Sequence, residues 1–118
     1  MSELRRWEGW QLEESSAEAY ECYLVPLLFA PGAQYLVELA APGPGERVLD
    51  VACGTGIVAR RAVAKVGSGG MVVGLDINES MLEVARKVSA DIHPAIEWHQ
   101  GDATDMPLPD RAVDVVFC

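Results

Sequence analysis

The sequence predicts an α/β fold in which parallel strands alternate with helices behind a helical N-terminal segment. Two observations lead to this prediction. From residue 47 onward, short apolar runs alternate with helical patterns, which is typical of parallel strands joined by crossover helices. A glycine-rich turn follows the first apolar run and opens a helix, as in a Rossmann-like sheet. The chain has 118 residues, which suits one small domain.

The N-terminal segment is expected to be helical. Residues 1–14 mix charges with two tryptophans and predict an arm or a short irregular helix. A helical pattern begins near Ser15, and Pro26 is expected to end it. A second helix is predicted over residues 31–40, with a proline in its first turn.

The stretch from Tyr23 to Pro42 is apolar and has the length of a membrane span. The residues that interrupt it are Pro26, Pro31, Gly32, Gln34 and Glu38. Buried helices are therefore the preferred interpretation, and no membrane contact is expected.

A cluster of turn-forming residues, APGPGE over residues 41–46, divides the chain. The part before it, residues 1–45, is expected to be a helical segment that covers a ligand site. The part after it, residues 46–118, is expected to be a Rossmann-like half-domain.

The half-domain is predicted to contain four strands and two helices. The strands are predicted over residues 47–52, 71–75, 95–100 and 112–118, and the helices over residues 56–66 and 79–90. Asn78 is expected to cap the second helix. The apolar side chains on one face of that helix are Met81, Leu82, Ala85 and Val88.

The last predicted strand, AVDVVFC, has too few polar residues to alternate. Such a strand is expected to be covered on both faces within a parallel sheet. An unpaired outer edge on this strand would recruit another chain. A homo-oligomer through this edge or the neighbouring sheet face is therefore expected.

Composition argues against several classes of protein. The chain carries 9 Lys and Arg against 18 Asp and Glu, a net charge of −9, which argues against a nucleic-acid binder. Cys22, Cys53 and Cys118 have neither zinc-site nor disulfide spacing, so no metal site is expected and a reducing, cytoplasmic setting fits best. The N-terminus lacks the apolar core of a signal peptide.

Asp50 and the loop after it form the main candidate site. In VLDVACGTGIVA, residues 48–59, a strand runs into a loop whose glycines let a ligand approach the backbone. Free amides at the start of the following helix favour an anionic group. The Asp50 carboxylate instead favours an ammonium or sulfonium ion. The combination suits a zwitterionic ligand, such as the methionine end of S-adenosylmethionine.

Two further carboxylates follow the second and third predicted strands. Asp76 ends the second strand, where it can accept hydrogen bonds from both hydroxyls of a ribose. Because the ends of neighbouring parallel strands meet, Asp50 and Asp76 are expected to flank one crevice. Asp102 follows the third strand and could accept from an adenine amino group, while the Ala103 amide donates to a ring nitrogen.

Three motifs, LDVACGTG, GLDINESML and GDATDMPLPDRAVDVVF, together resemble the class I S-adenosylmethionine-dependent methyltransferases. The resemblance is particularly to the type 11, small-molecule branch near the ubiquinone and menaquinone biosynthesis enzymes, and it covers roughly Arg47 to Cys118. It implies S-adenosylmethionine as the cofactor and a small molecule as the methyl acceptor. The family sheet has seven strands in the order 3-2-1-4-5-7-6, of which this chain holds the first four.

The resemblance also implies roles for individual residues. The expected cofactor-binding residues are Asp50, Ala52, Cys53, Gly54, Gly56, Asp76, Ile77, Asp102 and Ala103. Asp50 and the loop after it would lie around the methionine moiety, and Asp76 would hold the ribose. Ile77 would pack on the adenine, and Asp102 with Ala103 would recognise its edge. Ala52 stands where the family commonly has glycine, and no catalytic residue can be named.

Alternative interpretations stay open. The glycine loop, with Ala59 in the last position of its motif, also fits an NAD(P)-binding domain of an oxidoreductase. A fragment that binds S-adenosylmethionine without catalysis is a second alternative.

Several single residues also have two interpretations. Asp102 could simply cap its loop, and Cys53 could be either a packing residue or a reactive thiolate. Tyr20 and Tyr23 could close over the ligand or pack in the core. A solvated helix face is expected for Arg60, Arg61 and Lys65.

Overall fold

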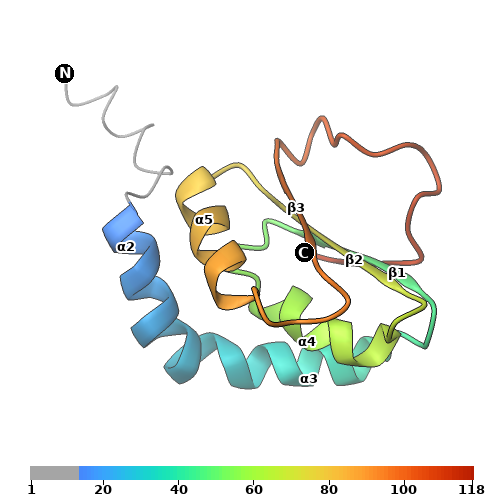
Figure 1. The fold of residues 1–118 in the computed structure, drawn as a ribbon, viewed down its shortest axis with the longest axis horizontal. Coiled ribbons are helices and arrows are strands. Elements are labelled where there is room, and N and C mark those ends of the chain that lie inside the picture. Colours follow the sequence, from blue (N-terminus) through green and yellow to red (C-terminus); the bar gives the residue numbers. More distant parts are fainter. Residues whose placement is uncertain (1–13) are drawn as a thin grey trace.

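Four parallel strands form one sheet in the computed structural model, which describes residues 14–118. The strands are β1 (Arg47–Val51), β2 (Met71–Asp76), β3 (Glu97–Gln100) and β4 (Val115–Phe117). Their order in the sheet is β3-β2-β1-β4, which confirms the expected partial Rossmann-like sheet; Figure 1 labels the first three of these strands. The arm expected over residues 1–14 lies, apart from its last residue, outside the described part of the chain.

β1 lies in the middle of the sheet and brings the candidate site residues together. It pairs with β2 and β4, so that Asp50 lies opposite Gly74 on one side and Phe117 on the other. On the far side of β2, Trp98 of β3 lies opposite the same Gly74. The carboxyl ends of all the strands therefore meet at one edge, as expected for a parallel sheet.

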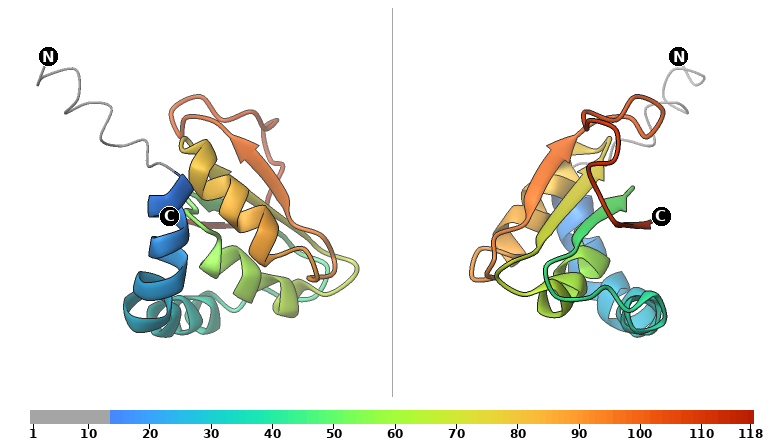
Figure 2. Two further views of the ribbon diagram at one scale, coloured as in Figure 1. Left: turned by 60° about the vertical axis from the view of Figure 1, so that its left-hand side comes forward. Right: turned by 90° about the vertical axis from the view of Figure 1, so that its right-hand side faces the viewer.

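The two faces of the sheet are covered differently (Figure 2). Val48 of β1 faces a core that includes Val37 of α3 (Ala30–Ala40) and several side chains of α4 (Ile57–Val66). Leu49 and Val51 face the opposite way, together with Val73 and Leu75 of β2. That second face packs against the loop between β3 and β4 through Leu108 and Val113. The alternation along β1 thus separates a helix-covered face from a loop-covered one.

The N-terminal helix is continuous, contrary to the expectation that Pro26 ends it. α2 (Glu14–Ala19) runs into the π-helical segment η1 (Tyr20–Phe29) and then into α3, with a marked bend visible in Figure 1. At the junction, the Ala30 amide donates to the Val25 carbonyl, five residues earlier. We attribute the continuity to this wider turn, which gives the Pro26 ring room that a regular α-helical turn lacks.

α5 (Glu79–Val88) begins as expected and differs at its end. The Asn78 Oδ1 atom accepts a hydrogen bond of 3.2 Å from the Ser80 amide, which confirms the expected cap. Met81, Leu82 and Ala85 are buried, but Val88 is 40% exposed because the helix ends there and the chain turns toward β3. Val84, which the sequence pattern did not include, is buried instead.

β4 is shorter than predicted and is covered on one face only. Phe117 is buried in the helix-covered core, whereas Val116 is 57% exposed on the loop-covered face. The expectation of cover on both faces is therefore wrong for Val116, because the loop between β3 and β4 reaches Leu49 and Val73 and leaves Val116 open. Self-association through this edge stays a prediction.

Candidate functional site

The loop between β1 and α4 turns through backbone conformations that favour glycine. Gly54 and Gly56 have φ angles of 59° and 85°, which is why glycine is needed at both positions. Ala52 also has a positive φ, 55°, a conformation that disfavours alanine. The alanine that departs from the common family pattern therefore stands at a left-handed position.

Asp76 fixes this loop from the neighbouring strand. Its Oδ2 atom accepts a hydrogen bond of 2.8 Å from the Gly54 amide, and its Oδ1 atom accepts one of 2.8 Å from the Asn78 amide. The Cys53 amide donates to the Leu75 carbonyl at 3.0 Å. The half-buried Asp76 carboxylate thus joins two loops and keeps lone pairs for a ligand.

Asp50 is only 4% exposed and is the most strongly perturbed carboxyl group of the site. Burial, opposed by the hydrogen bond of 3.2 Å from the Ala59 amide and aided by the nearby Asp76 charge, raises the pKa of Asp50 to about 7. Neither of these partners is a cation. A buried carboxylate without a cationic partner is costly, and a cationic ligand beside it would lower that cost.

Two cavities lie on either side of the end of β1, and both are lined by Val51 and Ala52. The larger, about 400 Å³, is lined by Asp50 and Cys53 and by apolar side chains of η1 and α3. The smaller, about 180 Å³, is lined by Asp76, Ile77, Gly101, Asp102 and Ala103. The structure therefore brings seven of the nine expected cofactor-binding residues to two adjoining cavities.

Gly54 and Gly56 line neither cavity and instead let aromatic rings approach the loop. The Tyr20 ring lies against Gly54. The Trp98 ring lies so close to Gly56 that a methyl group there would overlap it, and the same holds at Gly74. The indole Nε1 of Trp98 donates to the Ser89 hydroxyl at 3.3 Å. The Trp98 ring thus lies across β2 at Gly74 and packs against the loop between β1 and α4 at Gly56.

Asp102 caps its loop, and its contact with adenine stays a prediction. Its Oδ1 atom accepts from the Thr104 amide at 2.9 Å and from the Thr104 hydroxyl at 2.8 Å, as in a loop cap. These hydrogen bonds lower the pKa of Asp102, so its carboxylate stays ionised. The residue also lines the smaller cavity beside Ala103.

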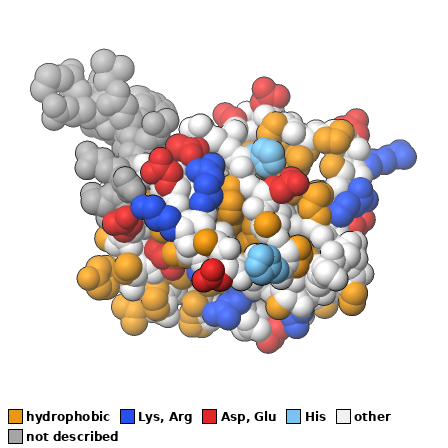
Figure 3. All heavy atoms as spheres, viewed as in Figure 1, with side chains coloured by type: hydrophobic (Ala, Val, Ile, Leu, Met, Phe, Trp, Pro, Cys, Tyr) orange, Lys and Arg blue, Asp and Glu red, His pale blue; other side chains and the backbone are white. Residues whose placement is uncertain are grey.

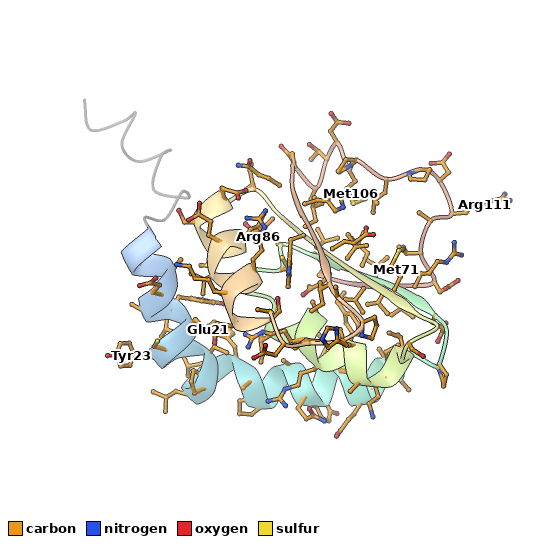
Figure 4. The ribbon with its side chains drawn as sticks, viewed as in Figure 1. Glu21, Tyr23, Met71, Arg86, Met106 and Arg111 are labelled. Atoms are coloured by element: carbon orange, nitrogen blue, oxygen red, sulfur yellow. The ribbon has the colours of Figure 1, made fainter. Side chains whose placement is uncertain are left out.

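The N-terminal helix reaches the site through Tyr20, one of the two tyrosines expected either to close over the ligand or to pack in the core. Tyr20 lines the larger cavity and stacks on Phe29, with ring centres 5.4 Å apart. Burial, followed by the charges of Glu21, Asp76 and Asp50, raises the pKa of Tyr20. Tyr23, by contrast, is exposed and points away from the sheet (Figure 4).

An ion pair joins the helix to α4 beside the site. The Nη2 atom of Arg60 contacts the Glu21 carboxylate, and both side chains are largely buried. The expectation of a solvated face is therefore wrong for Arg60, although Arg61 and Lys65 are exposed. The sequence signal that could have found this pair is weak, because 39 residues separate the two partners.

Cys53 is a buried packing residue rather than a reactive one. It is 8% exposed, and burial raises the pKa of its thiol, with the charges of Asp50 and Asp76 adding to the shift. The thiol therefore stays protonated and is a poor nucleophile.

The residues present fit the expected cofactor. Asp50 offers negative charge to a cation, and Asp76 offers acceptors to a ribose. The strand order, the glycine turn and the paired carboxylates define a Rossmann-like domain built to bind a zwitterionic nucleoside.

Comparison with known proteins identifies the family. The methyltransferase-domain family matches residues 48–118, and the chain belongs to this family. A solved structure of an S-adenosylmethionine-dependent methyltransferase from Aquifex aeolicus has the same fold, with a TM-score of 0.72 at 23% identity over 90% of this chain and 56% of that one. Membership in this family makes S-adenosylmethionine the cofactor of this domain.

Curated relatives are more similar in sequence. The 2-phytyl-1,4-naphthoquinone methyltransferase of Synechococcus elongatus is 41% identical over 80 residues, which are 66% of this chain and 34% of the relative. The ubiquinone/menaquinone biosynthesis C-methyltransferase UbiE of Ectopseudomonas mendocina is 44% identical over 85 residues, which are 70% of this chain and 33% of the relative. The chain thus spans about a third of the length of these relatives.

The contact between Trp98 and Gly74 generates a first prediction. Gly74→Ala and Trp98→Leu should each lower the free energy of unfolding, the first by steric overlap and the second by lost packing. In the double variant the smaller leucine leaves room for the new methyl group, so its loss should be smaller than the sum, by roughly 1–3 kcal/mol. Urea unfolding of the four proteins measures this coupling. Strictly additive losses would show that the ring does not press on Gly74.

A second prediction follows from the buried Asp50 carboxyl. The pKa of Asp50 is higher in the folded chain than in the unfolded chain. The stability that this group contributes is therefore fully present below its pKa in the unfolded chain and is lost as the pH rises through about 7. Asp50→Asn keeps the acceptor for the Ala59 amide and removes the charge. From pH 5 to pH 8, the free energy of unfolding of Asp50→Asn should therefore rise relative to that of the parent chain by roughly 2–3 kcal/mol. Urea unfolding at both pH values tests this, with exposed Asp91→Asn as control. Parallel pH curves for parent and Asp50→Asn would contradict it.

Proposed function

We propose that this chain is the cofactor-binding region of a methyltransferase that transfers a methyl group from S-adenosylmethionine to a small, quinone-type acceptor. The observation that carries the proposal is the buried Asp50 carboxyl group in the wall of the larger cavity, next to the smaller cavity that Asp76 lines. One cavity suits a nucleoside and the other suits an apolar acceptor. The names of the quinone methyltransferase relatives support the class of acceptor.

The proposed positions of the cofactor follow from the two cavities. Asp76 and Asp102 line the smaller cavity, where they would hold the ribose and the adenine with Ile77 against the ring face. The Ala103 amide would donate to the edge of the adenine. Asp50 lies on the other side of Ala52 and would face the charged methionine end. The shared wall at Ala52 is where these two halves of the cofactor would join.

The chemistry asks little of the protein beyond placement. When bound, S-adenosylmethionine supplies a methyl group on an already activated sulfonium, so that orientation contributes most of the catalysis. Tyr20 and Phe29 form one wall of the larger cavity and Asp50 another, so an apolar acceptor bound there would lie beside the sulfonium group. No general base is assigned to the reaction. A cytoplasmic location of the protein stays a prediction.

The decisive test is parallel calorimetric titration of the chain with S-adenosylhomocysteine and with NAD. S-adenosylhomocysteine should bind with a single site, and NAD should show no saturable heat. The oxidoreductase alternative predicts the opposite pattern, and the comparisons with known proteins give it no support. Binding of NAD without S-adenosylhomocysteine would refute the proposed function.

Asp76 provides a sharper prediction at single-residue level. Asp76→Ala removes the proposed acceptor of two ribose hydroxyls and also the acceptor of the Gly54 and Asn78 amides, a loss of at least roughly 1.5–3 kcal/mol. The dissociation constant of S-adenosylhomocysteine should therefore rise at least about tenfold. Exposed Asp91→Ala removes the same charge away from both cavities and should leave the constant unchanged. Circular dichroism checks that both variants fold, and an unchanged constant in Asp76→Ala would place the ribose elsewhere.

A further inference from the structure

The indole ring of Trp98 reaches from β3 to the loop between β1 and α4, residues 52–56, which we call the cofactor loop. The Cη2 atom of the ring lies where a methyl group on Gly56 would be. Its Cε3 and Cζ3 atoms lie where a methyl group on Gly74 would be. The ring therefore fits only because both positions are glycine, and it is in close contact with the cofactor loop.

The far side of the indole is fixed to the C-terminal end of α5. The Nε1 atom of Trp98 donates to the Ser89 hydroxyl at 3.3 Å, and that hydroxyl donates to the Ala85 carbonyl at 2.6 Å. Ser89 is the residue that ends α5 and is only 8% exposed. The position of the ring is thus set both by packing and by a buried hydrogen bond.

The N-terminal end of α5 is connected to the same loop. Asp76 accepts hydrogen bonds from the Gly54 amide and from the Asn78 amide, and Asn78 caps α5. The cofactor loop is therefore connected to both ends of one ten-residue helix, at Gly54 through Asp76 and at Gly56 through Trp98.

The contact at Gly56 bears on the geometry around Asp50. Gly56 is the N-cap residue of α4, and its carbonyl accepts a hydrogen bond of 2.8 Å from the Arg60 amide. In the same first turn, the Ala59 amide donates to the Asp50 carboxyl group at 3.2 Å. A ring that fixes Gly56 therefore also fixes the turn of α4 that contacts Asp50.

The N-terminal helix lies against the cofactor loop less closely. The nearest atom of Tyr20 is 3.7 Å from the place that a methyl group on Gly54 would take, an ordinary van der Waals distance. The expectation of buried helices is wrong for this segment. The helix over Ser16–Ala40 is long and apolar enough to cross a membrane, yet only 17% of its most apolar window is buried. Hydrophobic side chains gather at the lower left and lower edge of Figure 3, where η1 and α3 run. The close contact with the loop thus comes from β3.

We propose that Trp98 is a positioning residue of the cofactor site, which sets the affinity for S-adenosylmethionine by holding Gly56 and the first turn of α4. Trp98 lines neither cavity, so it acts through the loop and not by touching the cofactor. The inference rests on the proposed function, in which the methionine end of the cofactor lies against this loop. A binding loop that is displaced even slightly loses contacts with its ligand.

The first experiment is calorimetric titration of Trp98→Phe with S-adenosylhomocysteine. Phenylalanine keeps an aromatic ring beside Gly74 but lacks the outer indole atoms that reach Gly56. The dissociation constant should rise at least about fivefold, and in Trp98→Leu, which has no ring, at least as much. All titrations are made where urea unfolding shows that each variant is folded.

Val72→Ala is the matched control. Val72 is 1% exposed in the same core, at the opposite end of β2 from Asp76, and lines neither cavity. Its truncation lowers the free energy of unfolding without touching the cofactor loop. Its dissociation constant for S-adenosylhomocysteine should therefore stay within about twofold of the parent value.

Hydrogen exchange of single amides, followed by NMR, separates positioning from general stability. In Trp98→Phe the amides of Gly54, Gly56 and Ala59 should exchange at least about tenfold faster than in the parent chain, because the loop opens locally. Val72→Ala should instead accelerate the amides of β1 and β2 and leave those of the loop unchanged.

A parent-like dissociation constant in Trp98→Phe overturns the proposal, and so does a loss of affinity that Val72→Ala shares. Unchanged exchange of the loop amides in Trp98→Phe also overturns it. A parent chain that does not bind S-adenosylhomocysteine refutes the proposed function instead, and the exchange rates then still show whether Trp98 holds the loop.

Discussion

The hydrogen bond from the Gly54 amide to the Asp76 carboxylate is the contact on which the site depends. It joins the loop after β1 to the loop after β2, and the second carboxylate oxygen accepts from Asn78 at the start of α5. A single side chain therefore ties the loop after β1 to the start of α5. Because the hydrogen bonds are charge-assisted, they are stronger than neutral ones, and they hold the loop in its shape.

The fold could be predicted from sequence because its signals are local. Apolar runs such as Val48–Val51 show where the strands lie, and a right-handed crossover then leaves few possible strand orders. The candidate carboxylates could be predicted for the same reason. Asp50 and Asp76 lie at the ends of strands one and two, and any parallel pairing of those strands brings their ends together.

The remaining features depend on contacts between distant residues. Nothing in the local pattern indicates that Trp98 crosses β2 to reach Gly56, or that Glu21 pairs with Arg60. The continuity of the N-terminal helix through Pro26 depends on a π-helical turn that proline statistics disfavour. Hydropathy indicated that the same helix is apolar, but it could not indicate which side faces the sheet. Small residues such as Ala33 lie on the side that packs inward, and a mean hydropathy over the whole helix does not show on which side they lie.

Ala52 lies in the wall that the two cavities share, and its left-handed backbone has a consequence for the entropy of binding. Glycine at this position would adopt the same turn without strain, but it would also visit many others when the loop opens. Alanine visits fewer conformations in the unfolded chain, so less conformational freedom is lost when the turn forms. The strain of the left-handed Ala52 backbone then lowers the free energy of unfolding and does not reduce the free energy of ligand binding. A loop ordered in this way gives up little further freedom when a ligand arrives, and more of the contact energy appears as affinity.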